Sequence, residues 1–143
     1  MATMDDVVGM AGTEQGLCVV ATVRPDGSVH ASVVNAGPIA HPETGEETLA
    51  FVARGTARKV ALLRSAGRAS ITYRRGWKWA GIEGRADIVG PDDVEAGEMA
   101  RLLRSIFVGA GGTHDDWDEF DRVMEAEGRV AVFVRAERVL GNN

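Results

Sequence analysis

Hydrophobic residues occur in short alternating or continuous runs over much of this chain, and these runs predict strands. The clearest is residues 17–24, which a turn signal at 25–28 joins to a second apolar run at 29–34, so that the two are expected to form a hairpin. Residues 36–47 are expected to form loops. Further strands are predicted at 48–53, at 68–73, at 77–89 with a bend at Gly81 or Gly84 and an end at Pro91, and at 129–134.

Between these strands the hydrophobic period changes from two to that of a helix. Met99, Leu102, Leu103 and Ile106 follow the spacing i, i+3, i+4 and i+7, which places them on one helical face. Four helices are expected: one over 3–10 with Thr3 as its cap, one over 60–66 ended by Gly67, one begun by the capping pair Asp92 and Glu95, and one from Thr113 to Gly128 with Trp117, Phe120 and Met124 on one face.

Six strands with mostly hairpin connections and few crossovers predict a small antiparallel β-barrel with added helices. The length of 143 residues and a hydrophobic content of 45% suit a single domain spanning 1–143. The net charge of −5 argues against nucleic acid as a partner. The chain has one cysteine, no signal-like start and no apolar run long enough to span a bilayer, so we expect a cytoplasmic protein without a membrane partner.

The segment Arg54-Gly55-Thr56-Ala57-Arg58-Lys59 lies between a predicted strand and a predicted helix, and it has the features of an anion site. Thr56 falls at the expected N-cap, where free backbone N–H groups and the positive end of the helix dipole would face a phosphate. Arg58 and Lys59 could add charge-assisted hydrogen bonds. The pattern also fits an ordinary capped helix with solvated cations, because its glycines do not follow Walker or dinucleotide-binding spacing.

The other polar residues give little sign of side-chain catalysis. His30, His41 and His114 fall in a strand, a loop and a helix start, without the short spacing of metal ligands, so no metal is expected. Cys18 lies in an apolar strand without a nearby base and is interpreted as a packed thiol. Paired carboxylates, a serine triad and a glycine-rich dinucleotide loop are absent from the sequence, so any enzymatic chemistry is expected to come from a cofactor.

Two further patterns have competing interpretations. Trp77 and Trp79 are two residues apart in the predicted strand 77–89, so they would share one face and could stack on a planar ligand or a partner subunit. Packing in the core is the alternative. The acidic run 115–121 surrounds a helix whose apolar face is already accounted for, which favours a solvated face over a metal or substrate site.

The order of these segments resembles the pyridoxamine 5'-phosphate oxidase-like split β-barrel superfamily, whose members bind FMN or related cofactors. The resemblance extends over nearly the whole chain and rests on the segments 16–27, 54–68 and 77–86. The segments His114-Asp115-Asp116-Trp117 and Arg138-Val139-Leu140-Gly141 are most similar to the actinobacterial branch that uses the deazaflavin coenzyme F420.

The resemblance implies a set of cofactor-binding residues. Arg58 and Lys59 would hold the cofactor phosphate, with Arg54 and Thr56 as neighbours. The ring would lie against the backbone of Val52 and Ala53, near His30 and Ser32. Two subunits would share each site, and Trp77 and Trp79 would close it from the partner chain.

The chain departs from the superfamily at two points. Ala57 stands where an arginine is usual, and Arg58 could take its place. The basic C-terminal substrate motif of true pyridoxamine phosphate oxidases is missing, because Arg135-Ala136-Glu137-Arg138 is followed almost at once by Asn142-Asn143. We therefore do not expect vitamin B6 oxidation.

The expected function is a homodimeric oxidoreductase that transfers hydride from reduced F420 to an unsaturated, quinone-like or tetrapyrrole acceptor. An FMN-dependent reductase of the same fold is the first alternative. A non-catalytic protein that stores or carries F420 or a flavin is the second, since the sequence contains no side chain whose presence would separate turnover from binding.

Overall fold

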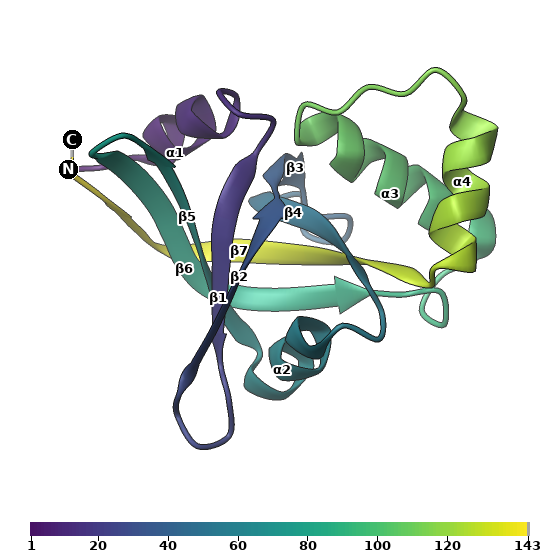
Figure 1. Cartoon of the computed structure of the whole chain (residues 1–143), viewed down its shortest axis with the longest axis horizontal. Helices are drawn as coiled ribbons and strands as arrows, with labels where there is room; N and C mark the ends of the chain where they lie inside the picture. The colour runs from purple at the N-terminus through teal and green to yellow at the C-terminus, as the bar shows by residue number, and fades with distance from the viewer. Residues whose placement is uncertain (143) are drawn as a thin grey trace.

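Seven antiparallel strands form one sheet in the order β2-β1-β5-β6-β7-β4-β3 in a computed structural model that describes residues 1–142 (Figure 1). The strands are β1 (Leu17–Val23), β2 (Val29–Asn35), β3 (Gly37–Ala40), β4 (Glu47–Arg54), β5 (Arg68–Arg75), β6 (Lys78–Val89) and β7 (Arg129–Gly141). The helices are α1 (Met4–Ala11), α2 (Arg58–Ala66), α3 (Ala96–Gly109) and α4 (Trp117–Ala126). The result is a split β-barrel with added helices, as the sequence predicted.

The split lies between β2 and β4. These strands contact each other but are not neighbours in the hydrogen-bonding order, so no ladder closes the barrel there. At the other side of the sheet, β6 carries a bulge between Glu83 and Gly84, which confirms the predicted bend. A Cβ on Gly84 would lie 1.7 Å from the Arg135 carbonyl oxygen, so only glycine permits this close approach of β6 to β7.

Strands β4 and β7 are covered on both faces, which explains their continuous apolar runs. One face contributes Phe51 and Val132 to the main core, together with Ile71 of β5. The other face presents Ala50 and Phe133 to a second core formed by α3 and α4. In Figure 1 these two helices lie together at one end of the molecule, and both chain termini lie at the other.

Several sequence expectations are confirmed at the level of individual elements. The β1–β2 hairpin pairs Leu17 with Asn35 through Val23 with Val29. Thr3 caps α1 in a capping box with Asp6. Cys18 is buried as predicted, and burial raises the pKa of its thiol to about 11.

Two predicted helix caps are wrong. The helix expected over 60–66 begins at Arg58, and its N-cap is Ala57, which has no side chain able to cap. Thr56 lies in the preceding turn, because the N–H of Ala57 bonds back to the Arg54 carbonyl. The predicted pair Asp92 and Glu95 does not cap α3, whose N-cap Glu95 makes no side-chain cap bond. The carboxylate that acts locally is that of Asp93, which accepts from the N–H of Gly90.

The predicted strands also differ from the structure in number and extent. The expected loop over 36–47 contains strand β3, a four-residue edge strand with Pro38 inside it, where proline conceals the strand signal. Strand β7 runs to Gly141 and not to residue 134, because its charged second half pairs with β6. Trp77 lies in the β5–β6 turn and not in a strand.

Across the residues described, no helix is both long and apolar enough to cross a membrane.

Candidate functional site

A cavity of about 660 Å³ lies at the split of the barrel. Its walls come from the end of β2, from the end of β4 with the start of α2, from α3 and α4, and from the start of β7. The complete lining is Gln15, Val33, Val34, Asn35, Val52, Ala53, Arg54, Ala57, Lys59, Ile106, Phe107, Ala110, Gly112, Thr113, Phe120, Met124 and Arg129. The cavity is therefore built by segments from nearly the whole length of the chain.

One end of the cavity is cationic. Arg54 and Arg129 are directly opposite each other in the β4–β7 ladder, an arrangement of like charges that costs stability unless a counter-ion is present. Glu127 is that counter-ion. Its Oε2 lies 3.1 Å from Nη2 of Arg54, and its Oε1 lies 2.9 Å from Nε of Arg129.

Lys59 enters the same end from the first turn of α2. Burial lowers the pKa of its ammonium group, and the nearby positive charge of Arg129 lowers it further. No ion pair to Lys59 is found among residues 1–142. An anion bound here would relieve this unfavourable environment, and the start of α2, which lacks a side-chain cap, adds the positive end of a helix dipole.

The opposite wall is apolar and aromatic. Ile106 and Phe107 of α3 and Phe120 and Met124 of α4 line it. Behind them Trp117 packs edge-on against Phe107 and Phe120, with ring centroids 6.1 and 5.2 Å away. This wall belongs to the same chain as the cationic end.

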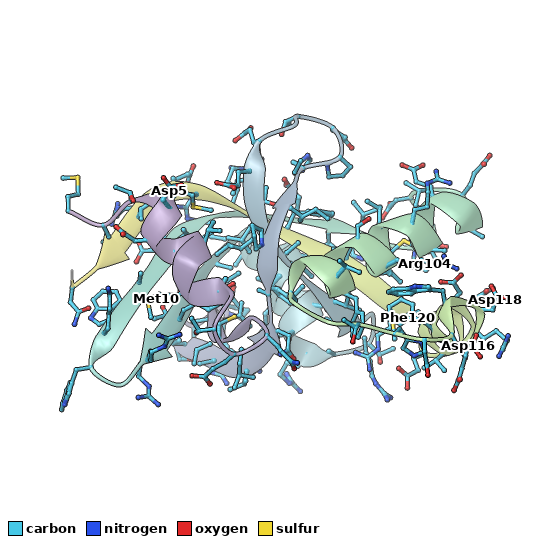
Figure 2. All side chains as sticks on the ribbon, turned by 90° about the horizontal axis from the view of Figure 1, so that it is seen from above. Asp5, Met10, Arg104, Asp116, Asp118 and Phe120 are labelled. Atoms are coloured by element: carbon cyan, nitrogen blue, oxygen red, sulfur yellow. The ribbon has the colours of Figure 1, made fainter. Side chains whose placement is uncertain are left out.

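An ion pair holds the two helices of this wall together. Nε of Arg104, on α3, donates to Oδ1 of Asp121 on α4 over 2.9 Å, and its guanidinium lies over the Trp117 ring at 5.5 Å. Figure 2 shows Arg104 and Phe120 close together where the helices meet, with Asp116 and Asp118 toward the outside of α4. Asp116 caps α4 through the N–H of Glu119, and Asp118 is exposed, so most of the acidic run is a solvated face as predicted.

Two buried polar atoms next to the cavity have no hydrogen-bond partner: Nδ1 of His30 and Oγ of Ser32. Both residues precede Val33, Val34 and Asn35, the part of β2 that lines the cavity, and strand alternation places them on the buried face with Val34. A buried polar group without a partner costs about 1–3 kcal/mol. Polar ligand atoms near this strand would satisfy the two groups, so the residues present fit a cofactor with a polar ring edge and an anionic end.

The structure brings together only part of the predicted site. Val52, Ala53, Arg54 and Lys59 line the cavity. His30 and Ser32 do not line the cavity but lie earlier on β2, the strand whose end forms one of its walls. Thr56 and Arg58 are exposed and do not line the cavity, because the first turn of α2 directs Lys59 inward instead.

The two tryptophans lie outside this cavity. Trp77 is 94% exposed at the tip of the β5–β6 hairpin, and Trp79 lines a separate small cleft against α1. The Asn142 side chain fixes the tip, since its amide donates to the Trp77 carbonyl over 2.6 Å and its Oδ1 accepts from the Trp79 N–H over 2.9 Å. Neither residue reaches the cavity of its own chain.

Sequence reasoning missed the residues that come from the C-terminal third. Phe120 and Met124 were placed on the apolar face of a helix, whose usual role is core packing, and Phe107 was not singled out. Arg129 gave no signal except its place directly after Gly128. Its partnership with Arg54 depends on strand register, which a single sequence does not reveal.

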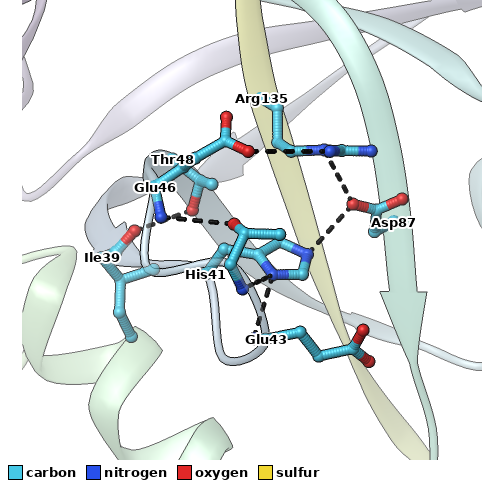
Figure 3. A network of polar contacts seen from close by, with 8 residues as sticks. Ile39, His41, Glu43, Glu46, Thr48, Asp87 and Arg135 are labelled. Carbon is cyan, nitrogen blue, oxygen red and sulfur yellow. Dashed lines mark hydrogen bonds and ion pairs between the residues drawn. The ribbon is translucent and has the colours of Figure 1, made fainter.

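A second polar cluster lies away from the cavity, where the loop after β3 meets β6 and β7 (Figure 3). His41 is buried, its Nε2 lies 3.0 Å from Oδ2 of Asp87, and its Nδ1 accepts from the N–H groups of Glu43 and Thr44. Because Nδ1 accepts these bonds, the ring proton is on Nε2 and is donated to Asp87. Arg135 lies 3.0 Å from the same carboxylate oxygen and 3.8 Å from Glu46. Every charge in this cluster has a counter-ion within the chain.

Comparison with known proteins finds a matching protein family and several solved structures with a similar fold. The profile described as pyridoxamine 5'-phosphate oxidase matches residues 10–142. No curated protein matches. Among the solved structures, Rv2991 of Mycobacterium tuberculosis superposes with a TM-score of 0.72 at 20% identity and covers 99% of this chain and 84% of its own.

Two further structures share the fold and have described cofactors. A pyridoxamine 5'-phosphate oxidase-related, FMN-binding protein of Nostoc punctiforme has a TM-score of 0.64 at 11% identity, covering 99% of this chain and 84% of its own. An F420 reductase has a TM-score of 0.58 at 18% identity, covering 91% of this chain and 94% of its own. At these identities the superpositions establish the fold and leave the cofactor of this chain open.

Proposed function

The chain belongs to the pyridoxamine 5'-phosphate oxidase family, and from that premise we propose that it is an oxidoreductase that binds reduced coenzyme F420 in the cavity at the barrel split. The acceptor of the hydride is an unsaturated, quinone-like or tetrapyrrole compound. The observation that carries the proposal is one cavity with a cationic end at Arg54, Lys59 and Arg129 and an apolar, aromatic wall at the other side. Such a cavity suits a flat ring joined to a phosphate.

Each part of the cavity has a role in this proposal. Lys59 and the N-terminus of α2 bind the phosphate, with Arg129 beside them. The backbone at Val52 and Ala53 lies along the ring, and His30 and Ser32 hydrogen-bond its polar edge. The wall formed by α3 and α4 excludes water from the reacting face.

When bound, the reduced cofactor supplies the hydride. The protein contributes position and electrostatics, and no side-chain nucleophile is required. Titration of the purified protein with F420 and with FMN tests this assignment. Binding of F420 supports the proposal, whereas tight binding of FMN alone would assign the chain as an FMN-dependent reductase.

The second candidate function is storage or transport of the cofactor without turnover. It is favoured by the side chains that line the aromatic wall, Ile106, Phe107, Phe120 and Met124, none of which can act as an acid or base. His114 packs against the rings of Phe107 and Phe120 but is not part of the cavity lining. Single-turnover oxidation of the bound reduced cofactor by a panel of enones, quinones and tetrapyrroles distinguishes the two. An oxidation rate no faster than that of the free cofactor with every acceptor supports storage.

We also propose that the protein is a homodimer. The outer face of the β1–β2 hairpin carries five exposed aliphatic side chains, from Leu17, Val19, Val23, Val29 and Val33. Val19 faces Val33 across the ladder and Val23 faces Val29, so they form a continuous apolar strip on an edge hairpin. Such a strip is normally covered by a partner, and a second copy of the chain supplies an identical strip.

Light scattering of the Val19→Lys variant tests the dimer. A charge at the centre of the strip should convert the dimer to a 15.2 kDa monomer. Val108→Lys, which adds the same charge to the exposed end of α3, should remain dimeric. A wild-type monomer with full cofactor affinity would contradict both the dimer and the prediction that Trp77 and Trp79 close the site of a partner.

A further inference from the structure

Glu127 occupies an unusual position for a residue beside a proposed phosphate site. It precedes β7 by two residues, and its carboxylate contacts both Arg54 and Arg129, the two arginines that line the cavity. Glu127 does not itself line the cavity. Its negative charge lowers the positive potential that the two guanidinium groups present to a ligand. A site built only to maximise anion affinity would not place a carboxylate there.

The charges around the cavity can be counted from these contacts. Three cations line it: Arg54, Lys59 and Arg129. Both arginines are already paired with Glu127, which leaves Lys59 as the one lining cation without an ion pair in the part of the chain that the structure describes. One carboxylate offsets one of the three positive charges, so the cavity keeps a net charge of plus two (3 − 1), and the first negative charge of a ligand can pair with Lys59. A ligand with two must place its second charge close to the Glu127 carboxylate or separate that carboxylate from an arginine.

We propose that Glu127 shifts the charge preference of the site toward a phosphodiester monoanion, because its repulsion opposes a phosphomonoester dianion about twice as strongly in free energy. This inference rests on the proposed function, because it takes the cationic end of the cavity to be the phosphate site. A phosphomonoester carries close to two negative charges at neutral pH, since its second pKa is about 6. A phosphodiester has a single acidic proton and carries one. FMN ends in a phosphomonoester, whereas the phosphate of the deazaflavin coenzyme is a diester, so Glu127 acts against FMN.

The test uses three ligands that share the flavin ring and ribityl chain and differ at the phosphate: riboflavin has none, the methyl ester of FMN has a monoanionic diester, and FMN has a monoester. Their affinities are measured for wild type, for Glu127→Gln and for Glu119→Gln at low salt. Glu119→Gln is the matched control, because it removes the same charge from the exposed start of α4, eight residues before Glu127, and Glu119 forms no ion pair with either arginine. Coulomb's law at a separation of several ångströms in a water-like dielectric gives about threefold in affinity for each ligand charge.

Glu127→Gln should therefore leave riboflavin affinity unchanged, tighten the methyl ester about threefold and tighten FMN about tenfold. Glu119→Gln should change none of them by more than a small factor, and added salt should reduce the differences. Equal changes for the methyl ester and FMN would overturn the inference. A uniform loss for all three ligands would also overturn it, since that result indicates that Glu127 only holds the arginines in place.

A second ligand pair separates this inference from the proposed function. Methyl phosphate and dimethyl phosphate carry the same two charge states without a ring, and their binding is followed by phosphorus NMR line broadening. If these bind with the predicted dependence on Glu127 and no flavin or deazaflavin binds, the charge preference stands and the cofactor assignment fails. If neither the two methyl phosphates nor any flavin or deazaflavin binds, the charge preference and the proposed function are both overturned.

Discussion

Two clusters of charged side chains in this protein differ in how completely their charges are paired. Around His41 each charge has a counter-ion, and both ring nitrogens of the buried imidazole are engaged (Figure 3). At the barrel split, Lys59 has no ion pair in the described chain, and the buried polar atoms of His30 and Ser32 have no partner. Both clusters carry costs of burial. In the first, even Nε of Arg135, which makes no hydrogen bond, lies 3.0 Å from the Asp87 carboxylate as an ion pair. The comparison separates a cluster that stabilises the fold from one prepared for a ligand.

The largest expected effect is on cofactor affinity at Lys59. A charge-assisted contact to phosphate is worth about 1.5–3 kcal/mol, so Lys59→Ala should weaken F420 binding about ten- to hundredfold. Lys78→Ala is the matched control, because Lys78 is the only other lysine and lies in the β5–β6 region away from the cavity. Fluorescence titration at low salt measures both, and added salt should narrow the difference. Equal affinities for wild type and Lys59→Ala would remove the phosphate site.

The His41 cluster should show the opposite behaviour, with a loss of stability and no loss of binding. His41→Ala leaves the N–H groups of Glu43 and Thr44 without their acceptor and removes one of the two partners of the Asp87 carboxylate, the other being Arg135. We expect the free energy of unfolding to fall by about 2–3 kcal/mol, measured by urea denaturation.

The control for His41 is Glu43→Gln, whose exposed side chain takes no part in the network, and it should retain wild-type stability. Cofactor affinity of folded His41→Ala should equal that of wild type. A large loss of affinity in this variant would show that the two clusters are coupled and that the distinction between them is wrong.

Arg129→Gln sharpens the comparison within the cavity itself. Arg129 lines the cationic end and lies close enough to Lys59 to lower its pKa. Loss of this cation should weaken binding about five- to tenfold, less than Lys59→Ala, because Glu127 already offsets part of its charge. Arg122→Gln, an exposed cation of α4 outside the cavity, should have wild-type affinity by the same titration. Equal losses in the two variants would indicate a long-range charge effect in place of a contact.

The smallest effect is expected at Ser32. Removing a buried hydroxyl that has no partner should leave the unliganded protein equally or slightly more stable, while the cofactor loses one hydrogen bond. Ser32→Ala should therefore raise the melting temperature of the free protein slightly and weaken cofactor binding severalfold. A destabilised free protein with unchanged affinity would mean that the hydroxyl has a structural role.

The sequence predicted the elements that carry a strong local signal. Alternation at 17–24 and 29–34 and the turn between them are enough to specify the β1–β2 hairpin, and the stripe from Met99 to Ile106 specifies α3. Strand β3 was missed because it is four residues long, includes Pro38 and is held by pairing with β4, which is a tertiary interaction. The cap of α2 was misplaced by one residue because Thr56 is the better capping side chain but the turn from Arg54 places Ala57 at the cap.

The sequence predicted the part of the candidate site that neighbouring residues form. It missed the part formed by residues that meet only through the pairing of distant strands. Lys59 lies in a strand-to-helix segment whose chemistry can be read from neighbouring residues. Arg129 and Glu127 are more than seventy positions from Arg54 along the chain and meet it only through the β4–β7 ladder. The aromatic wall of α4 has the spacing of ordinary core residues, so only the folded arrangement shows that it also lines a cavity.

The central claim is that Lys59 binds a cofactor phosphate in the cavity at the barrel split. The most direct measurement is the affinity of wild type and Lys59→Ala for FMN and for riboflavin, which differ only by that phosphate. We predict that the substitution weakens FMN binding about ten- to hundredfold and leaves riboflavin binding nearly unchanged. The difference between these two effects is the coupling free energy between Lys59 and the phosphate. Equal losses for FMN and riboflavin, or no loss for either, would contradict the claim.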